Sequence, residues 1–371
     1  MNSLDQRIVA TYLLHCAADE AKSLARAVAV EQSIEMDETA VHDARLLERI
    51  VGRVESIKQQ GQTAITRISF DPQLADGQLG QLLNLAYGSV SLYPGVRLIK
   101  LDLPDVVARL IGGPGYGIQG IRRATSTADR PLLCAVLKPR GTESAGLAKL
   151  AGELARGGAD LIKDDQNLAE ADLEAFKTRV SMCQEAILKA SAATGQRCLY
   201  LPHVSGAGPG LHQRLEFLAE SDIRAVLMCP WIMGLEHCKS LARQYKLIYM
   251  AHPVMAGAYY QPAGQGIAAA VLFGLLSRLG GADCVLFPGT SGRISVSEQQ
   301  HKRITEQLVS PLANLLSCMP ASGGGQTLET IVKTVFTDSP DRIIVVGGGL
   351  QTTHDSVADT TRRYHNALSR R

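Results

Sequence analysis

The sequence predicts an α/β protein in which a carboxyl-terminal (β/α)₈ barrel, the TIM-barrel fold, follows a small α+β domain of the ferredoxin-like type. From about residue 130 to the end, eight short apolar runs alternate with helical segments, which is the number and order of elements in an eight-stranded barrel. Before residue 130, strand and helix patterns mix without fixed alternation, as in an α+β domain. We therefore predict two domains, 1–125 and 126–371.

The barrel strands are predicted from short apolar runs bounded by polar residues and glycines. They are expected at 132–137, 159–162, 198–201, 224–228, 247–251, 283–287, 316–319 and 342–346, with helices that include 168–194, 234–244 and 295–314. An open, doubly wound parallel sheet is the competing interpretation. Eight evenly spaced strands favour the closed barrel.

The amino-terminal domain is predicted from mixed periodicities. Strands are expected at 7–15, 64–70 and 96–103, and helices at 18–31 and 76–87, while residues 43–57 carry two short apolar stretches. The glycine-rich stretch from Gly112 to Gly117 interrupts the pattern, which indicates a linker or a tight loop.

Composition excludes several classes of function. The 371-residue chain has a net charge of +2 and only 5% aromatic residues, which argues against nucleic-acid and membrane-surface binding. No apolar run approaches the roughly 20 residues of a membrane span. The eight cysteines form no CxxC pair, as expected of free thiols in a reducing cytoplasm. We expect a cytoplasmic protein.

Polar residues follow the predicted barrel strands, and barrel active sites are built at this end of the strands. Lys138 and Arg140 follow the first strand, Lys163 to Gln166 the second, His203 the third and His252 the fifth. Glycines follow the last two strands, in Ser322-Gly323-Gly324-Gly325 and Gly347-Gly348-Gly349. Backbone N–H groups at such positions bind anions, so we predict a phosphate site there rather than simple turns.

The stretch from Gly157 to Asn167 is the most informative one. Read as a strand, it places Lys163 and Asp165 on one face and Asp164 on the other. A lysine beside carboxylates at a strand end is either a satisfied salt bridge or a site of chemistry.

Taken together, these motifs resemble the RuBisCO large-subunit superfamily, and specifically its RuBisCO-like branch, which does not fix carbon dioxide. The resemblance rests on six segments in order and covers nearly the whole chain: Glu31-Gln32-Ser33, Gly112 to Gln119, Arg130 to Arg140, Gly157 to Asp165, and the two glycine runs.

The resemblance implies a carbamylated Lys163 that binds Mg²⁺ together with Asp165 and Gln166, and a catalytic role for Lys138. It also implies a phosphorylated small-molecule substrate whose phosphate is held by Ser322, Gly323, Gly324, Gly347 and Gly348. A homodimer is implied, with the active site at the subunit interface and Glu31 reaching the partner subunit's site. Carbamate and carboxylate oxygens are the hard ligands that Mg²⁺ prefers.

Departures from the family pattern argue against carboxylation. Gln166 stands where the family has a glutamate, which removes one negative charge from the metal site. Pro253 follows His252 in place of an arginine, and Phe287 ends the sixth strand in place of a histidine, so a second phosphate has no binding groups. Arg293 lies near the position of the carboxylase loop lysine. Ser89 replaces the lysine base of the enolase-type relatives.

For other residues at the strand ends, the sequence gives weaker evidence of a functional role. A lone histidine is more often a structural group, but His252 and His203 both follow strands at the active-site end. Trp231 is expected to line the pocket, and Arg140 to help position the substrate or its phosphate.

The sequence leaves three hypotheses of function open. The first is Mg²⁺-assisted enolisation of a phosphorylated ketose or sugar acid by an isomerase, enolase or decarboxylase, with Lys138, Lys163 and His252 as catalytic residues. The second is a metal-free lyase that forms a Schiff base on Lys138 or Lys163. The third is an inactive binding or regulatory protein.

Overall fold

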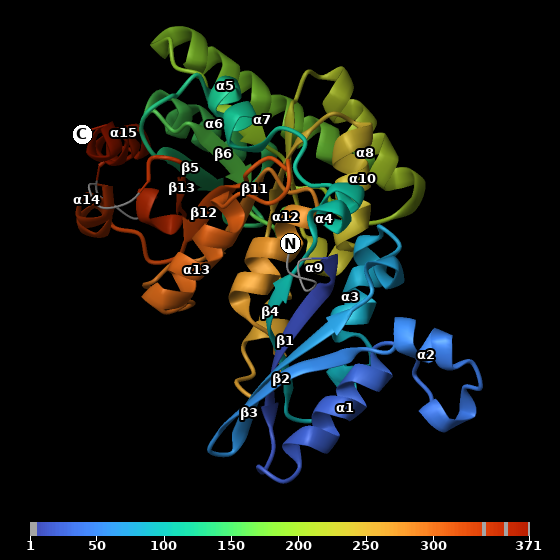
Figure 1. Cartoon of the computed structure of the whole chain (residues 1–371). Helices are drawn as coiled ribbons and strands as arrows, with labels where there is room; N and C mark the ends of the chain where they lie inside the picture. Colours follow the sequence, from blue (N-terminus) through green and yellow to red (C-terminus); the bar gives the residue numbers. More distant parts are fainter. Residues whose placement is uncertain (1–5, 336–338, 352–354, 370–371) are drawn as a thin grey trace. The chain divides into compact units, whose positions relative to one another are not determined.

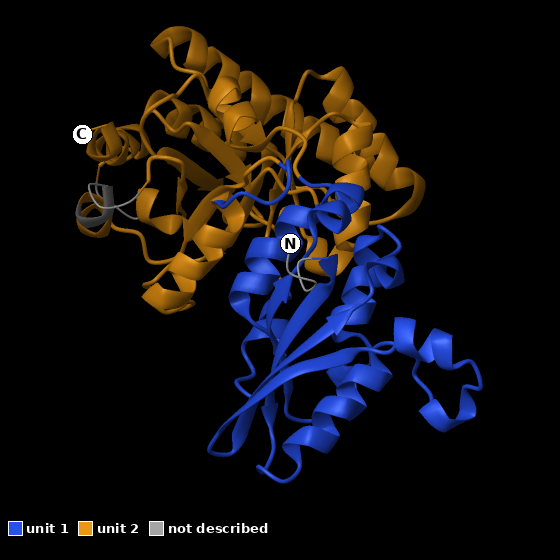
Figure 2. Ribbon diagram, in the orientation of Figure 1, with its two compact units in different colours: residues 1–113, 255–280, 310–315 blue, residues 114–254, 281–309, 316–371 orange. Residues whose placement is uncertain are grey.

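The computed structural model describes residues 6–335, 339–351 and 355–369. The chain divides into two compact units, of which the first comprises residues 1–113, 255–280 and 310–315, and the second comprises the rest (Figure 2). These units group residues by how densely they contact one another. The predicted boundary after residue 125 separates two domains that would each fold independently, which such a grouping does not test. That boundary stays a prediction.

The sheet of the first unit has the predicted ferredoxin-like arrangement. Its strands lie in the order β10-β4-β1-β3-β2, with β1 antiparallel to both β3 and β4, and the order along the chain is β1-α1-α2-β2-β3-α3-β4 (Figure 1). The bounds are β1 Ile8–His15, α1 Ala21–Glu31, α2 Ala44–Ile50, β2 Arg53–Gln60, β3 Thr63–Phe70, α3 Leu79–Tyr87, β4 Val96–Asp102, α4 Asp105–Ile111, α11 Gly257–Tyr260, β10 Gly266–Ile267 and α12 Ser277–Leu279.

The sequence did not predict two strands of this sheet. β2 is solvent-exposed along most of its length, so it lacks the apolar alternation that reveals a half-buried strand. β10 is a two-residue strand that pairs in parallel with β4. The Arg97 guanidinium reinforces that pairing by donating to the carbonyl of Tyr260 at 2.9 Å and to that of Gln265 at 2.8 Å.

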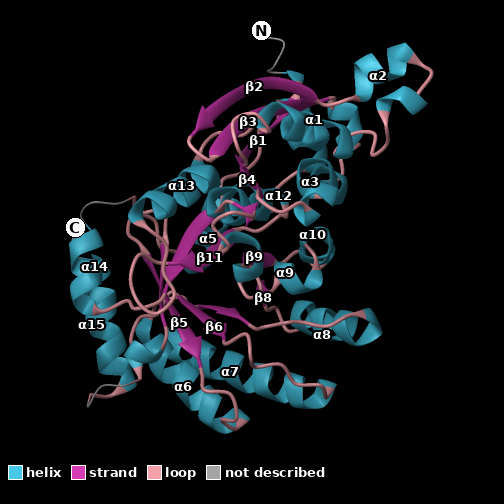
Figure 3. Cartoon of the chain, turned by 90° about the horizontal axis from the view of Figure 1, so that it is seen from below, coloured by secondary structure: helices cyan, strands magenta, loops and turns pink. Residues whose placement is uncertain are grey.

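The second unit is the predicted barrel. Its eight strands pair in parallel in the order β7-β6-β5-β13-β12-β11-β9-β8, and a bridge between His203 and Leu227 links the two outer strands. The helices lie outside these strands (Figure 3). The bounds are α5 Gly117–Thr125, β5 Leu132–Leu137, α6 Ser144–Arg156, β6 Leu161–Asp164, α7 Leu173–Thr194, β7 Leu199–Leu201, α8 Gly208–Glu220, β8 Ala225–Met228, α9 Pro230–Met233, α10 Leu235–Gln244, β9 Ile248–Ala251, β11 Cys284–Pro288, α13 Glu298–Val309, β12 Met319–Gly323, α14 Leu328–Val335, β13 Ile343–Val346 and α15 Val357–Ser369.

Two predicted barrel strands are shifted, since β6 begins and ends two residues after the predicted 159–162, and the seventh strand is shifted further. Residues 316–319 were expected to form the seventh strand, but β12 begins only at Met319. The residues before it hydrogen-bond to helices instead, since the Ser317 carbonyl accepts from the Ile118 N–H at 3.1 Å and the Cys318 N–H donates to Leu308 at 3.0 Å. Apolar character alone does not separate these residues from a strand.

Helix α5 was also missed, because Gly112 to Gly117 reads only as a loop. It covers the amino-terminal end of the barrel, where Ile118 and Ile121 join the barrel core. The carboxylate of Asp283, just before β11, accepts the backbone N–H groups of Tyr116 and Gly117 at 2.6 and 2.8 Å. These bonds fix the start of the helix beneath the strands.

Candidate active site

Alternate residues of the barrel strands point inward and fill the barrel with apolar side chains. These are Leu132, Cys134, Val136, Leu161, Leu201, Ala225, Leu227, Ile248, Met250, Cys284, Leu286, Met319, Ala321, Ile343 and Val345. Side chains alternate between the two faces of a strand, so two residues further along each strand gives the next inward layer. That layer consists of Lys138, Lys163, His203, Cys229, His252, Pro288, Gly323 and Gly347. The apolar core therefore ends in a layer of polar groups and glycines.

All these residues lie on the carboxyl rim, because the strands are parallel. Lys163 is opposite Val136 of β5, and Gly323 is opposite Val345 of β13. The lysine and the two glycine runs are thus on the same rim, as predicted. Barrel active sites are built on this rim.

Lys163 is deeply buried, at 2% exposure. Its ammonium donates to the backbone carbonyl of Asp164 at 2.8 Å. Burial lowers the pKa of this amine, and the nearby groups that oppose the shift, including Asp165, do not cancel it. No ion pair joins Lys163 to Asp165 in the described part of the chain, so the salt bridge considered above is not formed.

Asp164 points the other way, as the strand pattern predicts, and anchors the strand to α7. Its carboxylate accepts from Arg179 at 2.6 Å, from the Tyr200 hydroxyl at 2.8 Å and from the His203 backbone N–H at 2.9 Å. Arg179 also pairs with Glu170. Asp164 is therefore a structural group behind the site.

This network supports a prediction about stability. Asp164→Ala leaves the buried Arg179 guanidinium with one partner fewer, which we expect to lower the free energy of unfolding by roughly 3–5 kcal/mol. Urea denaturation followed by circular dichroism measures the change. Glu185→Ala, which breaks an exposed pair on α7, should have almost no effect. A loss for Asp164→Ala no larger than that of the control would contradict the assignment.

The acidic and amide groups after Lys163 have the chemistry of Mg²⁺ ligands. One carboxylate oxygen of Asp165 accepts from the backbone and side-chain nitrogens of Asn167, at 2.9 and 2.8 Å, and Gln166 is half-buried. The described residues contain no group of three or more His, Cys, Asp or Glu side chains arranged to hold a metal. With Lys163 as a carbamate, the set would offer anionic oxygens from Lys163 and Asp165 and an amide oxygen from Gln166, which are ligands of the kind that Mg²⁺ takes.

Lys138 lies against the glycine run after β13. A Cβ atom added to Gly347 would lie 2.7 Å from the Lys138 Nζ and 3.2 Å from its Cε. The side chain of Lys138 therefore occupies the space that the glycine leaves. Lys138, the predicted catalytic lysine, and the predicted phosphate site therefore lie side by side.

The glycine run after β12 is held by the loop after β11. Gly292 and Gly325 both have positive φ angles, 89° and 65°, and a Cβ on either would meet the other's backbone within 3 Å. The Gly289 N–H donates to the Gly323 carbonyl at 2.8 Å. Ser322 is buried at the end of β12, whereas Arg293 in the β11 loop and Arg140 after β5 are exposed.

The two predicted histidines are both neutral groups at the rim. Burial, followed by the charge of Lys163, holds the pKa of His252 well below its ordinary value. Its Nδ1 accepts the Val254 N–H at 3.2 Å, so the proton resides on Nε2. His203 is buried, and burial likewise lowers the pKa of its ring.

Glu31 belongs to the first unit, at the end of α1, where it accepts from the Tyr93 hydroxyl at 3.0 Å. The neighbouring Gln32 donates to the carbonyls of Asn84 and Leu85 at 2.7 and 2.9 Å, which ties α1 to α3. The predicted contact of Glu31 with a partner subunit's active site stays a prediction.

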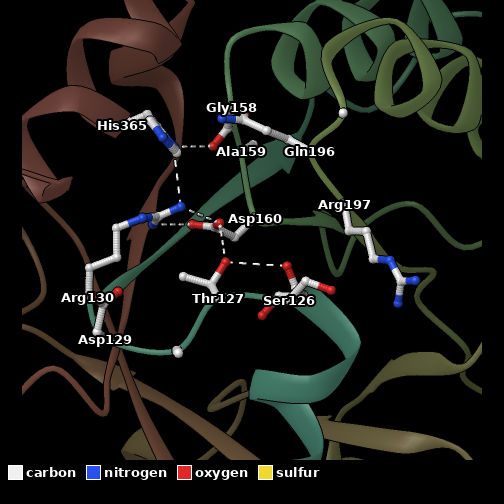
Figure 4. Close-up of a pocket in the computed structure, with 13 residues that line it drawn as sticks. Ser126, Thr127, Asp129, Arg130, Gly158, Ala159, Asp160, Gln196, Arg197 and His365 are labelled. Carbon is white, nitrogen blue, oxygen red and sulfur yellow. Dashed lines mark hydrogen bonds and ion pairs between the residues drawn. The ribbon is translucent and has the colours of Figure 1, made fainter.

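A cavity of about 460 Å³ lies at the opposite, amino-terminal rim (Figure 4). Arg130 and Asp160 form an ion pair of 2.7 Å beside it. The His365 Nδ1 donates to the Gly158 carbonyl at 2.7 Å, and a Cβ on Gly158 would clash with that ring at 2.9 Å. Gly157 and Gly158 therefore allow α15 to pack closely. The predicted active-site residues of this motif begin only at Lys163.

The fold and the site together define a two-unit protein whose barrel carries a lysine-centred, glycine-rimmed site. Residues 117–368 match the family model described as "Ribulose bisphosphate carboxylase large chain, catalytic domain". The chain belongs to the RuBisCO large-chain family. As the sequence motifs predicted, its similarity is to the RuBisCO-like proteins of that family.

Three relatives illustrate this similarity. The chain is 33% identical to "5-methylthioribulose-1-phosphate isomerase" of Rhodospirillum rubrum, over 97% of this chain and 96% of the relative. It is 29% identical to "2,3-diketo-5-methylthiopentyl-1-phosphate enolase" of Geobacillus kaustophilus, over 97% and 91%. The crystal structure of a Rubisco-like protein from Rhodopseudomonas palustris superposes with a TM-score of 0.88 at 33% identity and covers 98% of both chains. An isomerase-type or enolase-type enzyme is the function that these names support.

In the described residues, no helix is long and apolar enough to cross a bilayer.

Proposed function

We propose that this protein is an isomerase that enolises a phosphorylated ketose, with 5-methylthioribulose 1-phosphate as the first substrate to test. The observation that carries the proposal is the contact of Lys138 with Gly347 on the rim that also holds Lys163. Enolisation needs a group that moves a proton from carbon and a site that fixes the substrate beside it. Similarity to a protein named 5-methylthioribulose-1-phosphate isomerase, over 97% of this chain, supports the choice of substrate.

In this proposal the phosphate binds to backbone N–H groups of Gly323, Gly324, Gly347 and Gly348, with Ser322 beside them. Glycine allows the anion close to the backbone. Arg140 and Arg293 are exposed on the same rim and add positive charge for the approach of the substrate.

Lys163 as a carbamate, Asp165 and Gln166 would hold Mg²⁺. When bound, the ion supplies Lewis-acid polarisation of the substrate carbonyl. The lowered pKa of Lys163 favours the neutral amine, the form that reacts with carbon dioxide. Lys138 moves the proton at carbon, and the neutral His252 offers its Nε2–H to a substrate oxygen.

The experiment is an assay of the purified protein with 5-methylthioribulose 1-phosphate, followed by ³¹P and ¹H NMR. We expect conversion to an isomer that depends on Mg²⁺ and stops when EDTA is added. Absence of conversion with or without Mg²⁺ would refute the isomerase. Conversion of 2,3-diketo-5-methylthiopentyl 1-phosphate alone would replace it with the enolase.

The buried, neutral-leaning Lys163 amine also favours a second candidate, the Schiff-base lyase. Sodium borohydride in the presence of substrate would then inactivate the enzyme, and EDTA would leave it active. We expect the opposite result for both reagents.

The glycine beside Lys138 supports a further prediction. Gly347→Ala places a methyl group 2.7 Å from the Lys138 Nζ, which is too close for a non-bonded contact, so the lysine has to move while the fold is kept. A misplaced catalytic group costs roughly 10²-fold in rate, which steady-state kinetics will show as a loss in kcat. Gly152→Ala on α6 is the control, since its new Cβ would sit at an ordinary 3.5 Å from Ala186. Equal activity of the two variants would contradict the placement of Lys138.

A further inference from the structure

Cys229 and His203 form a thiol–imidazole pair to which the proposed function gives no role so far. The Cys229 Sγ lies 3.6 Å from the His203 Nε2, within hydrogen-bonding distance for sulfur. Both belong to the inward layer at the carboxyl rim, at the ends of β8 and β7. Only 3% and 4% of their surfaces are exposed.

The contacts of the ring define which nitrogen carries the proton. The Nδ1 lies 3.2 Å from the Leu168 carbonyl oxygen, which can only accept, so Nδ1 is the donor. The Nε2 of the neutral ring is therefore an acceptor, and the thiol donates its S–H to it. The backbone N–H of His203 is itself held by Asp164 at 2.9 Å. The contacts thus supply a thiol, a base within reach and the Leu168 carbonyl, which orients the ring of the base. Burial raises the pKa of the Cys229 thiol to about 12, so the thiol rests protonated and passes its proton to His203 only as it takes another.

The pair lies across the barrel from the predicted phosphate site. In the strand order, β8 lies four places from β13, which in a closed eight-stranded barrel is across the mouth. A substrate whose phosphate is held after β12 and β13 would extend from Lys138 toward Cys229. Isomerisation of a ketose removes a proton from one carbon and adds one to the next, so a separate group can act at each carbon.

We propose that Cys229 is the second catalytic acid–base group of this isomerisation and that His203 is its positioning residue and proton acceptor. This inference rests on the proposed function. In one direction, Sγ takes a proton from a substrate carbon while the thiol proton passes to the His203 Nε2. The electron pair of the C–H bond stays on the substrate as an enediolate. The hydroxyl proton of that carbon moves to the neighbouring former carbonyl oxygen, and Lys138, as an ammonium, protonates the former carbonyl carbon.

The step needs no oxidant or co-reactant. The substrate loses one proton and gains one, so its composition is unchanged. The enzyme is left with one proton more on His203 and one fewer on Lys138, and exchange through solvent restores both. The reverse reaction uses the same groups in the opposite order.

The test is the reaction of 5-methylthioribulose 1-phosphate in D₂O, followed by ¹H NMR. The wild-type enzyme is expected to show two exchanges: the first at the hydroxyl-bearing carbon next to the carbonyl of the ketose, and the second as deuterium on the former carbonyl carbon of the isomer. Cys229→Ala should lose the first exchange and isomerise roughly 10²–10⁴-fold more slowly. Lys138→Met should keep the first exchange and form no deuterated isomer.

Further variants separate catalysis from structure. His203→Gln keeps a polar side chain that cannot take a proton, so kcat should fall while KM and Tm stay close to wild type. Cys284→Ala removes another buried thiol of the barrel interior and should retain both exchanges.

The outcomes distinguish the inference from the function on which it rests. Full isomerisation by Cys229→Ala, or wild-type rates of the first exchange in that variant, overturns the role of Cys229 and leaves the isomerase intact. A wild-type enzyme that neither labels nor converts this ketose overturns the isomerase itself.

Discussion

Lys138→Met is expected to abolish isomerisation while the protein remains folded. The side chain of Lys138 is half-buried at the end of β5 and lies against Gly347, and methionine fills similar space without a group that binds a proton. General acid–base catalysis contributes roughly 10²–10⁴-fold to a rate, and the loss is measured as kcat at saturating substrate. Thermal unfolding should be close to that of the wild type.

Lys149→Met is the matched control, since this lysine is exposed on α6. It should retain wild-type kinetics. Full activity of Lys138→Met would show that Lys138 is not catalytic. His203 and His252 would then be the next residues to test.

Lys163→Met is expected to remove Mg²⁺-dependent activity and to make the protein more stable. Without the amine no carbamate can form, and a Lewis acid is worth several kcal/mol of transition-state stabilisation. A buried charge without a carboxylate partner costs stability, and methionine removes that cost. Activity and stability should therefore change in opposite directions.

The stability difference should depend on pH in a defined way. Burial lowers the folded-state pKa of Lys163 from the usual 10.5, so the unfolded chain takes up this proton first as the pH falls. The wild type therefore loses stability relative to Lys163→Met from about pH 10.5 downward, until the pH passes the folded-state pKa. Denaturant titrations at several pH values measure the gap.

Two results would contradict the role of Lys163. One is a stability gap that is the same at pH 7 and pH 10.5. The other is wild-type activity that survives both removal of dissolved carbon dioxide and addition of EDTA.

The barrel was predictable because its strands are buried on both faces. Such strands appear as short apolar runs, and six of the eight were located to within one residue at each end, as at 132–137. The runs at 159–162 and 316–319 failed for a shared reason. Apolar residues of turns and helix contacts adjoin the true strands β6 and β12 and cannot be told from them by hydropathy.

The identities of the residues at the rim were also predictable, because each follows directly after a strand. Lys138, Lys163, His203 and His252 come to one rim as a necessary consequence of parallel strands. Cys229 was passed over, since a cysteine in an apolar run reads as a small core residue. Its distinguishing feature is the 3.6 Å contact with His203, between residues 26 positions apart.

By itself, then, the sequence determined the fold class, the family and the set of polar groups at one rim, because periodicity and order along the chain carry that information. Only the tertiary structure decided what each group touches. It showed that Asp164 is bonded to Arg179 behind the site, that Lys163 is buried without a carboxylate partner, and that Lys138 occupies the space above Gly347. Such contacts depend on strand register and side-chain direction across the barrel, which no local pattern encodes.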